Sequence, residues 1–527
     1  MPNASYDSAP YRPLRGERFW LLALLIMPLL ALYAPGLGYP LVFDDLNAAV
    51  LDPSKRRALL DGGGGIVRWL SNASFIWTVD IFGWLLPLLR LQNLLLHCAN
   101  VILLYTLLQA LFNAVLGRSA TNVSRHRWWA ALGALWFGFN PAAVYATAYL
   151  IQRSTLMATC FSLLALHGAL RAMQAERARG LWAVAAALAY VMALLSKEHA
   201  VLLPALMLAM ALLLLPQVQW RRWRWFLLVL ALAAVGFAVL RRATIAQPYE
   251  GHALAMLGMQ EVMSGQRLIE YAYPLSVLTQ CGLFFKYLLL WIVPLPEGMS
   301  IDMHPALFLS IWGGGQLVAL LGFGAWGVAG ILLLRRGGAA GLAGFGLLWP
   351  WLLFGTELAT VRVQEIFVLY RSYLWMAGLP FLIPLALTSI SPRIVRLLVP
   401  ALLIGLVPPA WDRLYSFSSN LRLWTDAVEK SGGRLNVLNG RAWMYRGVAR
   451  MKAGDLSGGG ADLEQAMKLD PWFAEPYGNR AVIALRQGRL DDALRDSNYA
   501  LEIDPGLEVF RRNRELILRL MQNKNAP

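Results

Sequence analysis

Two neighbouring aspartates follow the first apolar segment of the chain, in Leu41-Val42-Phe43-Asp44-Asp45-Leu46-Asn47. Ionisable side chains beside hydrocarbon are energetically costly, which favours a functional role for them. Adjacent like charges also raise the pKa of one partner, as suits a general base or a metal ligand. We therefore take Asp44 and Asp45 as candidate catalytic residues, with a solvated acidic loop as the alternative.

Several cations stand at the ends of apolar segments, where the phosphate of a membrane lipid would meet them. Arg371 opens the apolar run Ser372–Leu387, and Arg153 and Lys197 lie in short turns. The planar fork of a guanidinium binds two phosphate oxygens at once. These three residues are candidate phosphate ligands, and the alternative for each is an interfacial cation with a buried stem.

Further polar residues occupy similar positions at segment ends. His97 and His199 are expected to bond a phosphate or to orient Asp44, although a lone histidine on an apolar face often only packs. Glu198 directly follows Lys197, so it is either half of an interfacial ion pair or a site residue. The remaining candidates are Asp302, Glu365 and Tyr373.

The same residues form no compact metal-ligand motif. Zinc and other transition-metal sites draw their ligands from characteristic His, Cys, Asp and Glu spacings, which the chain lacks. No metal and no certain cofactor are predicted, although a divalent metal that bridges Asp44 or Asp45 with a glutamate or histidine remains open.

The amino-acid composition indicates what kind of secondary structure must position these residues. Of 527 residues, 58% are hydrophobic and 15% are charged, whereas soluble domains are about 45–50% apolar and about 25% charged. Apolar blocks such as Leu21–Leu32, Leu181–Leu195 and Phe226–Leu240 approach the roughly 20 residues that cross a bilayer as helix. We predict an all-α polytopic membrane protein, and we exclude nucleic-acid binding because the net charge of +16 lies in short clusters between apolar runs.

Arginine clusters recur at every second predicted loop, as the positive-inside rule expects of cytoplasmic loops. This pattern predicts about 11 crossings and an external C-terminus, with Leu278–Pro294 as a re-entrant or interfacial segment. Twelve crossings with a cytoplasmic C-terminus is the alternative. The longer, more acidic loops, 41–84 and 241–307, are then external. The clusters lie at Arg12–Arg18, Arg118–Arg127, Arg171–Arg179, Arg221–Arg224, Arg335–Arg336 and Arg393–Arg396.

The composition becomes polar after Trp411, and a period of 34 residues appears. It relates Trp443 to Tyr477, Gly454 to Gly488, Ala466 to Ala500 and Pro471 to Pro505. Small residues at helix crossings, with glycine after one helix and proline after the next, are typical of tetratricopeptide repeats. We predict a membrane domain over 1–411 and a small repeat domain over 412–527, which either binds a partner or acts as a structural lid.

The order of the motifs resembles the GT-C membrane glycosyltransferases, and most closely the transmembrane and tetratricopeptide-repeat O-mannosyltransferase-like branch. The shared motifs are Phe43-Asp44-Asp45, Asn93-Leu-Leu-Leu-His97, Asn140-Pro141 with Gln152-Arg153, Ser300-Ile301-Asp302, and Arg371-Ser372-Tyr373-Leu374, followed by the repeats. The short repeat block and Asn140, where many members have histidine, point to a bacterial form.

This resemblance implies an inverting transfer of a sugar from a polyprenyl-phosphate carrier to an acceptor hydroxyl on the periplasmic face of an inner membrane. Asp44 would be the base, with Asp45 as second choice, and Arg371 would be the favoured phosphate ligand. The acceptor would be a serine or threonine of an exported protein such as a pilin. The alternatives are a lipid-linked glycan polymerase or ligase, and a non-enzymatic scaffold or transporter with a docking domain.

Overall fold

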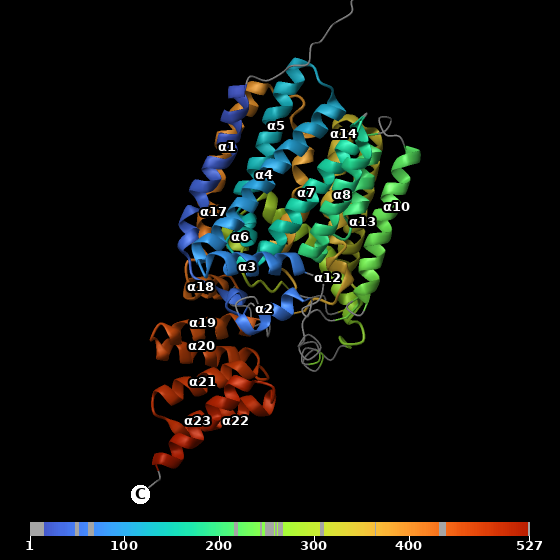
Figure 1. Ribbon diagram of the computed structural model, residues 1–527. Helices are drawn as coiled ribbons and strands as arrows, with labels where there is room; N and C mark the ends of the chain where they lie inside the picture. The colour runs from blue at the N-terminus through green and yellow to red at the C-terminus, as the bar shows by residue number, and fades with distance from the viewer. Residues whose placement is uncertain are drawn as a thin grey trace, which may run out of the picture.

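The computed structural model describes residues 15–47, 52–61, 68–175, 177–214, 220–242, 245–247, 258, 261, 267–305, 310–363, 365–431 and 439–524. Its helices form a long bundle, with a smaller stack of C-terminal helices at one end (Figure 1). Parts of the predicted loops 41–84 and 241–307, namely 48–51, 62–67, 243–244, 248–257, 259–260, 262–266 and 306–307, lie outside the described residues.

The bundle contains long helices and short connecting helices. The longer ones are α1 (Arg15–Tyr33), α4 (Leu86–Leu116), α5 (Ala120–Phe139), α7 (Arg153–Gln174), α8 (Arg179–Ser196), α9 (Leu203–Leu213), α10 (Trp220–Leu240), α12 (Ala272–Ile292), α13 (Gly314–Arg336), α14 (Gly338–Phe354) and α17 (Pro392–Ser416). At the repeat-facing end are α2 (Pro53–Leu60) and α3 (Trp69–Phe82), and shorter helices are α6 (Pro141–Thr147), α15 (Tyr373–Met376) and α16 (Ile383–Leu387).

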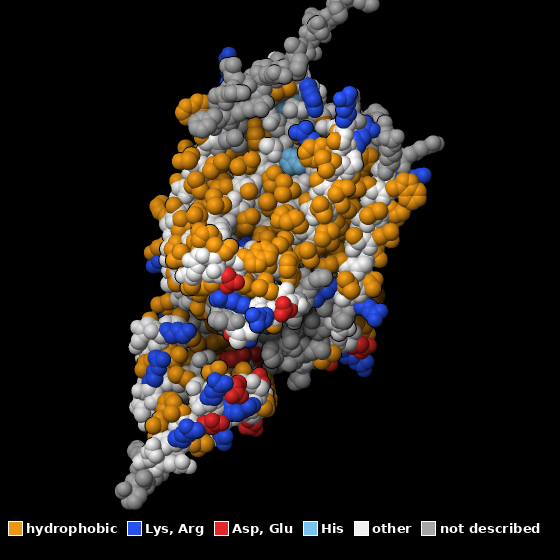
Figure 2. Space-filling view, in the orientation of Figure 1, with side chains coloured by type: hydrophobic (Ala, Val, Ile, Leu, Met, Phe, Trp, Pro, Cys, Tyr) orange, Lys and Arg blue, Asp and Glu red, His pale blue; other side chains and the backbone are white. Residues whose placement is uncertain are grey.

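Among the described residues, eight helices are long and apolar enough to cross a membrane, and two shorter apolar segments, Ala23–Gly38 and Glu198–Leu213, accompany them. Hydrophobic side chains cover the face of the bundle shown in Figure 2. Lys and Arg appear at both of its ends, whereas Asp and Glu appear only toward the C-terminal helices. The architecture is therefore that of an α-helical polytopic protein, as the composition predicts. The number of crossings and their orientation stay predictions.

The apolar run Ser372–Leu387 differs from a continuous span. It consists of α15, the 3-10 helix Leu379–Leu382 and α16, because Pro380 and Pro384 each remove a backbone N–H that a continuous helix needs. Irregular backbone is tolerated at membrane depth where protein surrounds it, and Leu374, Trp375 and Phe381 are all buried. The break places Arg371 at the start of a compact, protein-enclosed segment.

The segment predicted as re-entrant, Leu278–Pro294, falls largely in the single helix α12. Near its start, Ser276 donates to the carbonyl of Thr360, which follows α14. Near its end, the Trp291 carbonyl accepts from Asn140, which follows α5. Both α14 and α5 begin after basic loops, at Arg335–Arg336 and Arg118. These contacts attach the two ends of α12 to the segments that follow α14 and α5. The helix is long and apolar enough to cross a membrane, so the re-entrant or interfacial character of this segment stays a prediction.

The C-terminal helices are α18 (Asn420–Lys430), α19 (Gly440–Lys452), α20 (Leu456–Leu469), α21 (Ala474–Arg486), α22 (Leu490–Ile503) and α23 (Glu508–Lys524). Helices α19 and α20 recur as α21 and α22 with a displacement of 34 residues at every start and end.

The two helix pairs share their internal contacts as well as their lengths. Arg446 holds Asp462 through two bonds of 2.7 and 2.8 Å. One period later, Arg480 holds Asp496 through bonds of 2.7 and 2.9 Å. Two-point guanidinium–carboxylate pairing of this kind fixes the angle between two helices. The 34-residue repeat is thus a structural unit, while its membership of the tetratricopeptide class stays a prediction.

Candidate active site at the repeat-facing end of the bundle

Asp45 closes the loop that follows the first helix. Its carboxylate accepts hydrogen bonds from the backbone N–H of Ile151 at 2.9 Å and of Val42 at 3.5 Å, and the residue is only 2% exposed. Burial raises the pKa of Asp45 to about 7, although the N–H of Ile151 and the charge of Arg90 oppose this rise. Both carboxylate oxygens are thus engaged within the protein, so Asp45 fixes the loop.

Asp44 faces the other way, toward the charged groups of the site. Its backbone N–H donates to the Tyr149 hydroxyl at 3.2 Å, and its side chain is only partly buried. Burial raises the pKa of the Asp44 carboxyl, a hydrogen bond with Tyr149 lowers it, and Glu365, Arg441 and Asp302 act on it through their charges. Of the two aspartates, Asp44 is the one available to a substrate.

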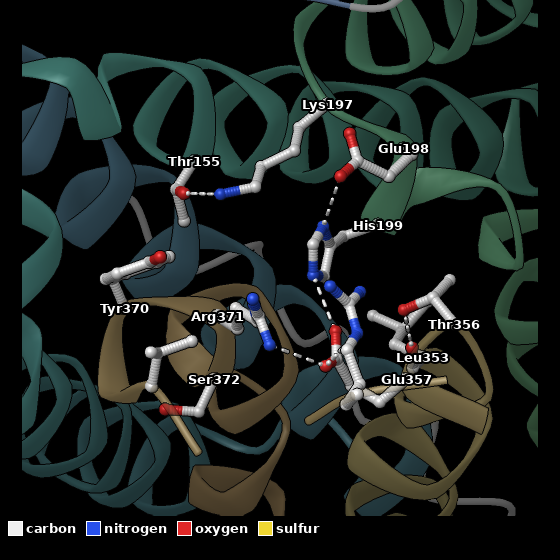
Figure 3. Close-up of polar contacts among 12 residues, drawn as sticks. Thr155, Lys197, Glu198, His199, Leu353, Thr356, Glu357, Tyr370, Arg371 and Ser372 are labelled. Carbon is white, nitrogen blue, oxygen red and sulfur yellow. Dashed lines mark hydrogen bonds and ion pairs between the residues drawn. The ribbon is translucent and has the colours of Figure 1, made fainter. Parts of the chain in front are cut away.

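Arg371 lies in a buried cluster of charges that joins three segments (Figure 3). The fully buried Glu357, in the 3-10 helix Glu357–Ala359, contacts Arg371 at 3.2 Å, His199 at 3.0 Å and Arg362 at 3.5 Å. Arg371 also pairs with Glu365 at 2.6 Å. Burial alone would raise the pKa of the Glu365 carboxyl, but Arg371 holds it below its ordinary value. The positive charge of Arg371 is therefore already balanced by two carboxylates.

Lys197 differs from Arg371 because its close partners are neutral. Its ammonium donates to the Gln152 side-chain oxygen at 2.9 Å and to the Thr155 hydroxyl at 2.6 Å, and it lies 5.2 Å from the centre of the Tyr370 ring. Within the described part of the chain, no carboxylate lies within 4.0 Å of it. Burial lowers the pKa of Lys197 to about 7. This buried cation is suited to an anionic ligand.

Glu198 does not form the expected ion pair with Lys197. Its carboxylate contacts Arg68 at 3.1 Å and the ring of His199 at 3.9 Å. Arg68 immediately precedes α3, so this pair attaches the segment between α1 and α4 to the turn after α8. Successive polar contacts thus connect Arg68 to Arg371. They run through Glu198, His199 and Glu357.

A pair of tyrosines lies between Asp44 and Lys197 in the network of contacts. The rings of Tyr149 and Tyr370 meet edge to face, with centres 5.9 Å apart. Tyr149 bonds Asp44, whereas Tyr370 lies under Lys197 and donates to Glu365 at 3.4 Å. Asp44 therefore contacts one ring of this aromatic pair and Lys197 contacts the other, which is the central geometric feature of this candidate site.

Asp302 joins the site from the loop after α12. It contacts His304 at 3.1 Å and forms a hydrogen-bonded ion pair with Arg441 of α19. An antiparallel bridge between Met303 and Phe367 aligns this loop with the segment before Arg371. Burial would raise the pKa of Asp302, but the guanidinium of Arg441 keeps it below its ordinary value.

His97 and Tyr373 lie together, but away from these charges. One ring nitrogen of His97 lies 2.7 Å from the Tyr373 hydroxyl and the other 3.0 Å from the Gly138 carbonyl. Both nitrogens are thus engaged, and the Tyr373 hydroxyl also accepts from Asn100 at 3.4 Å. These contacts tie α4 to α5 and α15, and among the described residues no hydrogen bond or ion pair joins either side chain to Asp44 or Arg371.

Arg153 is likewise used within the fold. Its guanidinium donates to Asn93 at 3.0 Å and to the Leu89 carbonyl at 2.9 Å, and it stacks on Phe75 at 3.7 Å. The side chain therefore connects α7 to α3 and α4. A phosphate role for Arg153 and His97 stays a prediction that these contacts do not support.

Sequence reasoning missed several residues of the site, namely Arg68, Tyr149, Glu357, Arg362, Tyr370 and Arg441. Glu357 carries the same signal that singled out Lys197, a lone charge at the end of an apolar segment. Arg441 carries no local signal, because it lies 139 residues from its partner Asp302. Within the described residues, no three His, Cys, Asp or Glu side chains gather in an arrangement that could hold a metal ion.

No protein-family model and no curated protein matches the chain. The chemistry of the site therefore has to be inferred from its own residues. They offer a carboxylate with a raised pKa, a buried cation beside neutral partners, and an aromatic surface between them. Such a site can remove a proton from a hydroxyl at one end and stabilise a departing anion at the other.

Proposed function

We propose that the protein is a membrane glycosyltransferase that moves a sugar from a polyprenyl-phosphate carrier to an acceptor hydroxyl. The observation that carries this proposal is a continuous series of contacts, in which Asp44 meets Tyr149, the Tyr149 ring packs on Tyr370, and Tyr370 lies beside Lys197. A transferase of this class needs a base for the acceptor and a cation for the phosphate. Both stand at the repeat-facing end of an apolar bundle, where a lipid phosphate would arrive.

In the proposed reaction, the acceptor hydroxyl gives its proton to Asp44 as its oxygen attacks the anomeric carbon. The bond between that carbon and the carrier phosphate breaks, and its electron pair remains on the phosphate oxygen. Attack from the face opposite the phosphate inverts the anomeric carbon. Asp44 is favoured over Asp45 as base because backbone N–H groups already engage both oxygens of Asp45.

Lys197 is the preferred phosphate ligand in this proposal. Arg371 is neutralised by Glu357 and Glu365, so a phosphate would have to displace a carboxylate from it. Lys197 would exchange the neutral oxygens of Gln152 and Thr155 for phosphate oxygens, at a much smaller electrostatic cost. Arg371 then acts mainly by holding Glu365 and the segment around Tyr370 in place.

The acceptor that best suits this arrangement is a serine or threonine of an exported protein such as a pilin. The 34-residue repeats stand beside the site and offer a helical surface that a polypeptide can follow. The site would then face the periplasm, with the arginine-rich end of the bundle toward the cytoplasm of a bacterial cell. A hydroxyl of another saccharide is the second candidate acceptor, because the same base and cation would serve it.

The test compares the wild type with Asp44→Asn and Lys197→Met at matched membrane levels. Two exposed residues supply controls of the same types, Asp80→Asn and Lys55→Met. The readout is mass spectrometry of exported proteins and of lipid-linked glycans.

We expect the loss of the base to reduce transfer by about 100-fold or more and the loss of the cation by about 100-fold. Both control variants should retain wild-type transfer. Changed lipid-linked glycans with unchanged proteins would favour the saccharide acceptor. Identical products from the wild type and both site variants would overturn the proposal.

A further inference from the structure

The first external loop is held by the C-terminal helices as well as by the bundle. The Phe43 N–H donates to the side-chain oxygen of Asn420 at 3.2 Å, and the Asn420 amide donates to the Leu41 carbonyl at 3.0 Å. The Phe43 ring meets Trp424 at 5.0 Å and Tyr445 at 5.6 Å, edge to face in both cases. The residue directly before Asp44 is thus enclosed by α18 and α19.

A second set of contacts fixes the same helices to the bundle. Arg413, near the end of α17, contacts Asp426 of α18 at 2.9 Å and donates to the Met299 carbonyl. Lys430 contacts Asp426 at 2.6 Å and the same carbonyl at 3.1 Å. Helix α18 is therefore anchored independently of α19, at the loop that carries Asp302.

Arg441 projects from this anchored block toward the carboxylates of the site. It pairs with Asp302, and its guanidinium lies 5.4 Å from the centre of the Phe43 ring. The Phe43 ring that Arg441 faces directly precedes Asp44 in the chain. The charge of Arg441 lowers the pKa of the carboxyls of Asp302, Glu365 and Asp44, which come from three different segments. Neighbouring carboxylates disfavour one another's ionisation, and a cation near them favours it.

We propose that the first repeat helix completes the candidate active site, with Arg441 as a positioning residue that keeps Asp302, Glu365 and Asp44 together as carboxylates. The C-terminal helices are then part of the site, in addition to any role in binding a partner. The inference rests on the proposed function in so far as Asp44 is the base. The placement of Arg441 among the carboxylates can be tested without any transfer reaction.

The protonation of Asp44 is the direct readout. The titratable and charged groups that face Asp44 or adjoin it are Asp45, Tyr149, Asp302, Glu365, Arg441 and Tyr445. The loss of the Arg441 charge should raise the pKa of Asp44, because a nearby cation favours the ionised carboxyl. The loss of the Asp302 charge should lower it, because Asp302 opposes ionisation of Asp44.

The experiment is an infrared titration of the full chain in lipid nanodiscs, with the carboxyl band of Asp44 assigned by its absence in Asp44→Asn. Arg441→Gln should move the midpoint of this band to higher pH, Asp302→Asn should move it to lower pH, and Arg441→Lys should restore much of the wild-type midpoint. Arg480→Gln is the matched control, because Arg480 pairs with an aspartate in the second repeat. Its midpoint should equal that of the wild type.

Spin labels on α23 and on the bundle should report an unchanged separation in Arg441→Gln, since Asn420 and Arg413 still hold α18. An unmoved Asp44 midpoint in Arg441→Gln would overturn the inference, as would a shift in the same direction for Arg441→Gln and Asp302→Asn. Detachment of the repeats in Arg441→Gln would overturn it too, by making Arg441 an anchor. If the protein transfers no sugar but the Asp44 midpoint still moves in opposite directions in Arg441→Gln and Asp302→Asn, the inference about Arg441 stands and only the proposed function is overturned.

Discussion

Replacement of Asp45 by asparagine should make folding stability less dependent on pH. Burial raises the pKa of this carboxyl from 3.8 to about 7. The folded protein then holds a proton at Asp45 that the unfolded chain has already released. Stability therefore falls as pH rises from about 4 to about 7 and stays at its lower value above that range. An asparagine side chain cannot ionise, so the Asp45→Asn variant lacks this part of the pH dependence.

The size of the effect follows from the same two values. One pKa unit corresponds to about 1.4 kcal/mol, so the folded wild type loses up to about 4 kcal/mol between pH 4 and pH 7 relative to Asp45→Asn. The asparagine oxygen can still accept from Ile151, whose N–H lies 2.9 Å from the carboxylate. The change of hydrogen bonding at Val42 adds an offset that does not vary with pH. The variation of the stability difference with pH is thus the quantity to measure.

Thermal unfolding in detergent from pH 5 to pH 8.5 supplies that measurement, with Asp80→Asn as an exposed control. The unfolding temperature of Asp45→Asn, relative to the wild type, should increase steadily up to about pH 7 and then level off. The control should follow the wild type at every pH. A difference between Asp45→Asn and the wild type that stays constant over this range would refute the assignment of Asp45 as a buried, loop-closing carboxyl.

Two further predictions concern stability. Glu357→Gln leaves Arg371 and Arg362 without their shared buried carboxylate. Unfolding by denaturant should show that the free energy of unfolding falls by about 3–5 kcal/mol, whereas Glu297→Gln, at an exposed position, should change it very little. A fall of less than about 1 kcal/mol in Glu357→Gln would contradict the buried charge cluster. Gly344→Ala would bring a methyl group within 2.2 Å of the α13 backbone and should cost about 1–3 kcal/mol. Gly324→Ala, which meets nothing within 4 Å, should be neutral, and equal unfolding temperatures for the two variants would contradict the close crossing.

Features with a local or periodic signal could be predicted from the sequence. The repeat is an example, because Gly454 and Gly488 both occupy the left-handed region, with φ of 92° and 74°, one period apart. Proline and glycine also mark helix ends in the chain itself, and Pro380 and Pro384 break the run after Arg371 into short helices. The choice of Asp44 and Lys197 likewise needed only their position at the ends of apolar segments.

Pairing across the bundle could not be predicted in the same way. The sequence places Arg371 at a segment end, but it does not tell that Glu357 and Glu365 neutralise it. His97 illustrates the same difficulty, since the Gly138 carbonyl and Tyr373 decide its role and both come from distant segments. The charge available at a site depends on which side chains meet, and this is set by the packing of helices that are far apart along the chain.

The backbone of the loop after α1 connects the candidate site to the C-terminal helices energetically. Phe43 has a φ of 52°, a conformation that costs a non-glycine residue about 1–3 kcal/mol. The rings of Trp424 and Tyr445 and the bond from Asn420 offset that cost, and all three come from the C-terminal helices. Without them the loop would relax to a more favourable φ, and Asp44, the next residue, would turn away from Tyr149. The position of the proposed base therefore depends on residues nearly 400 positions later in the chain, so a variant that weakens the Phe43 enclosure should disturb Asp44 even though it touches neither the carboxylate nor a ligand.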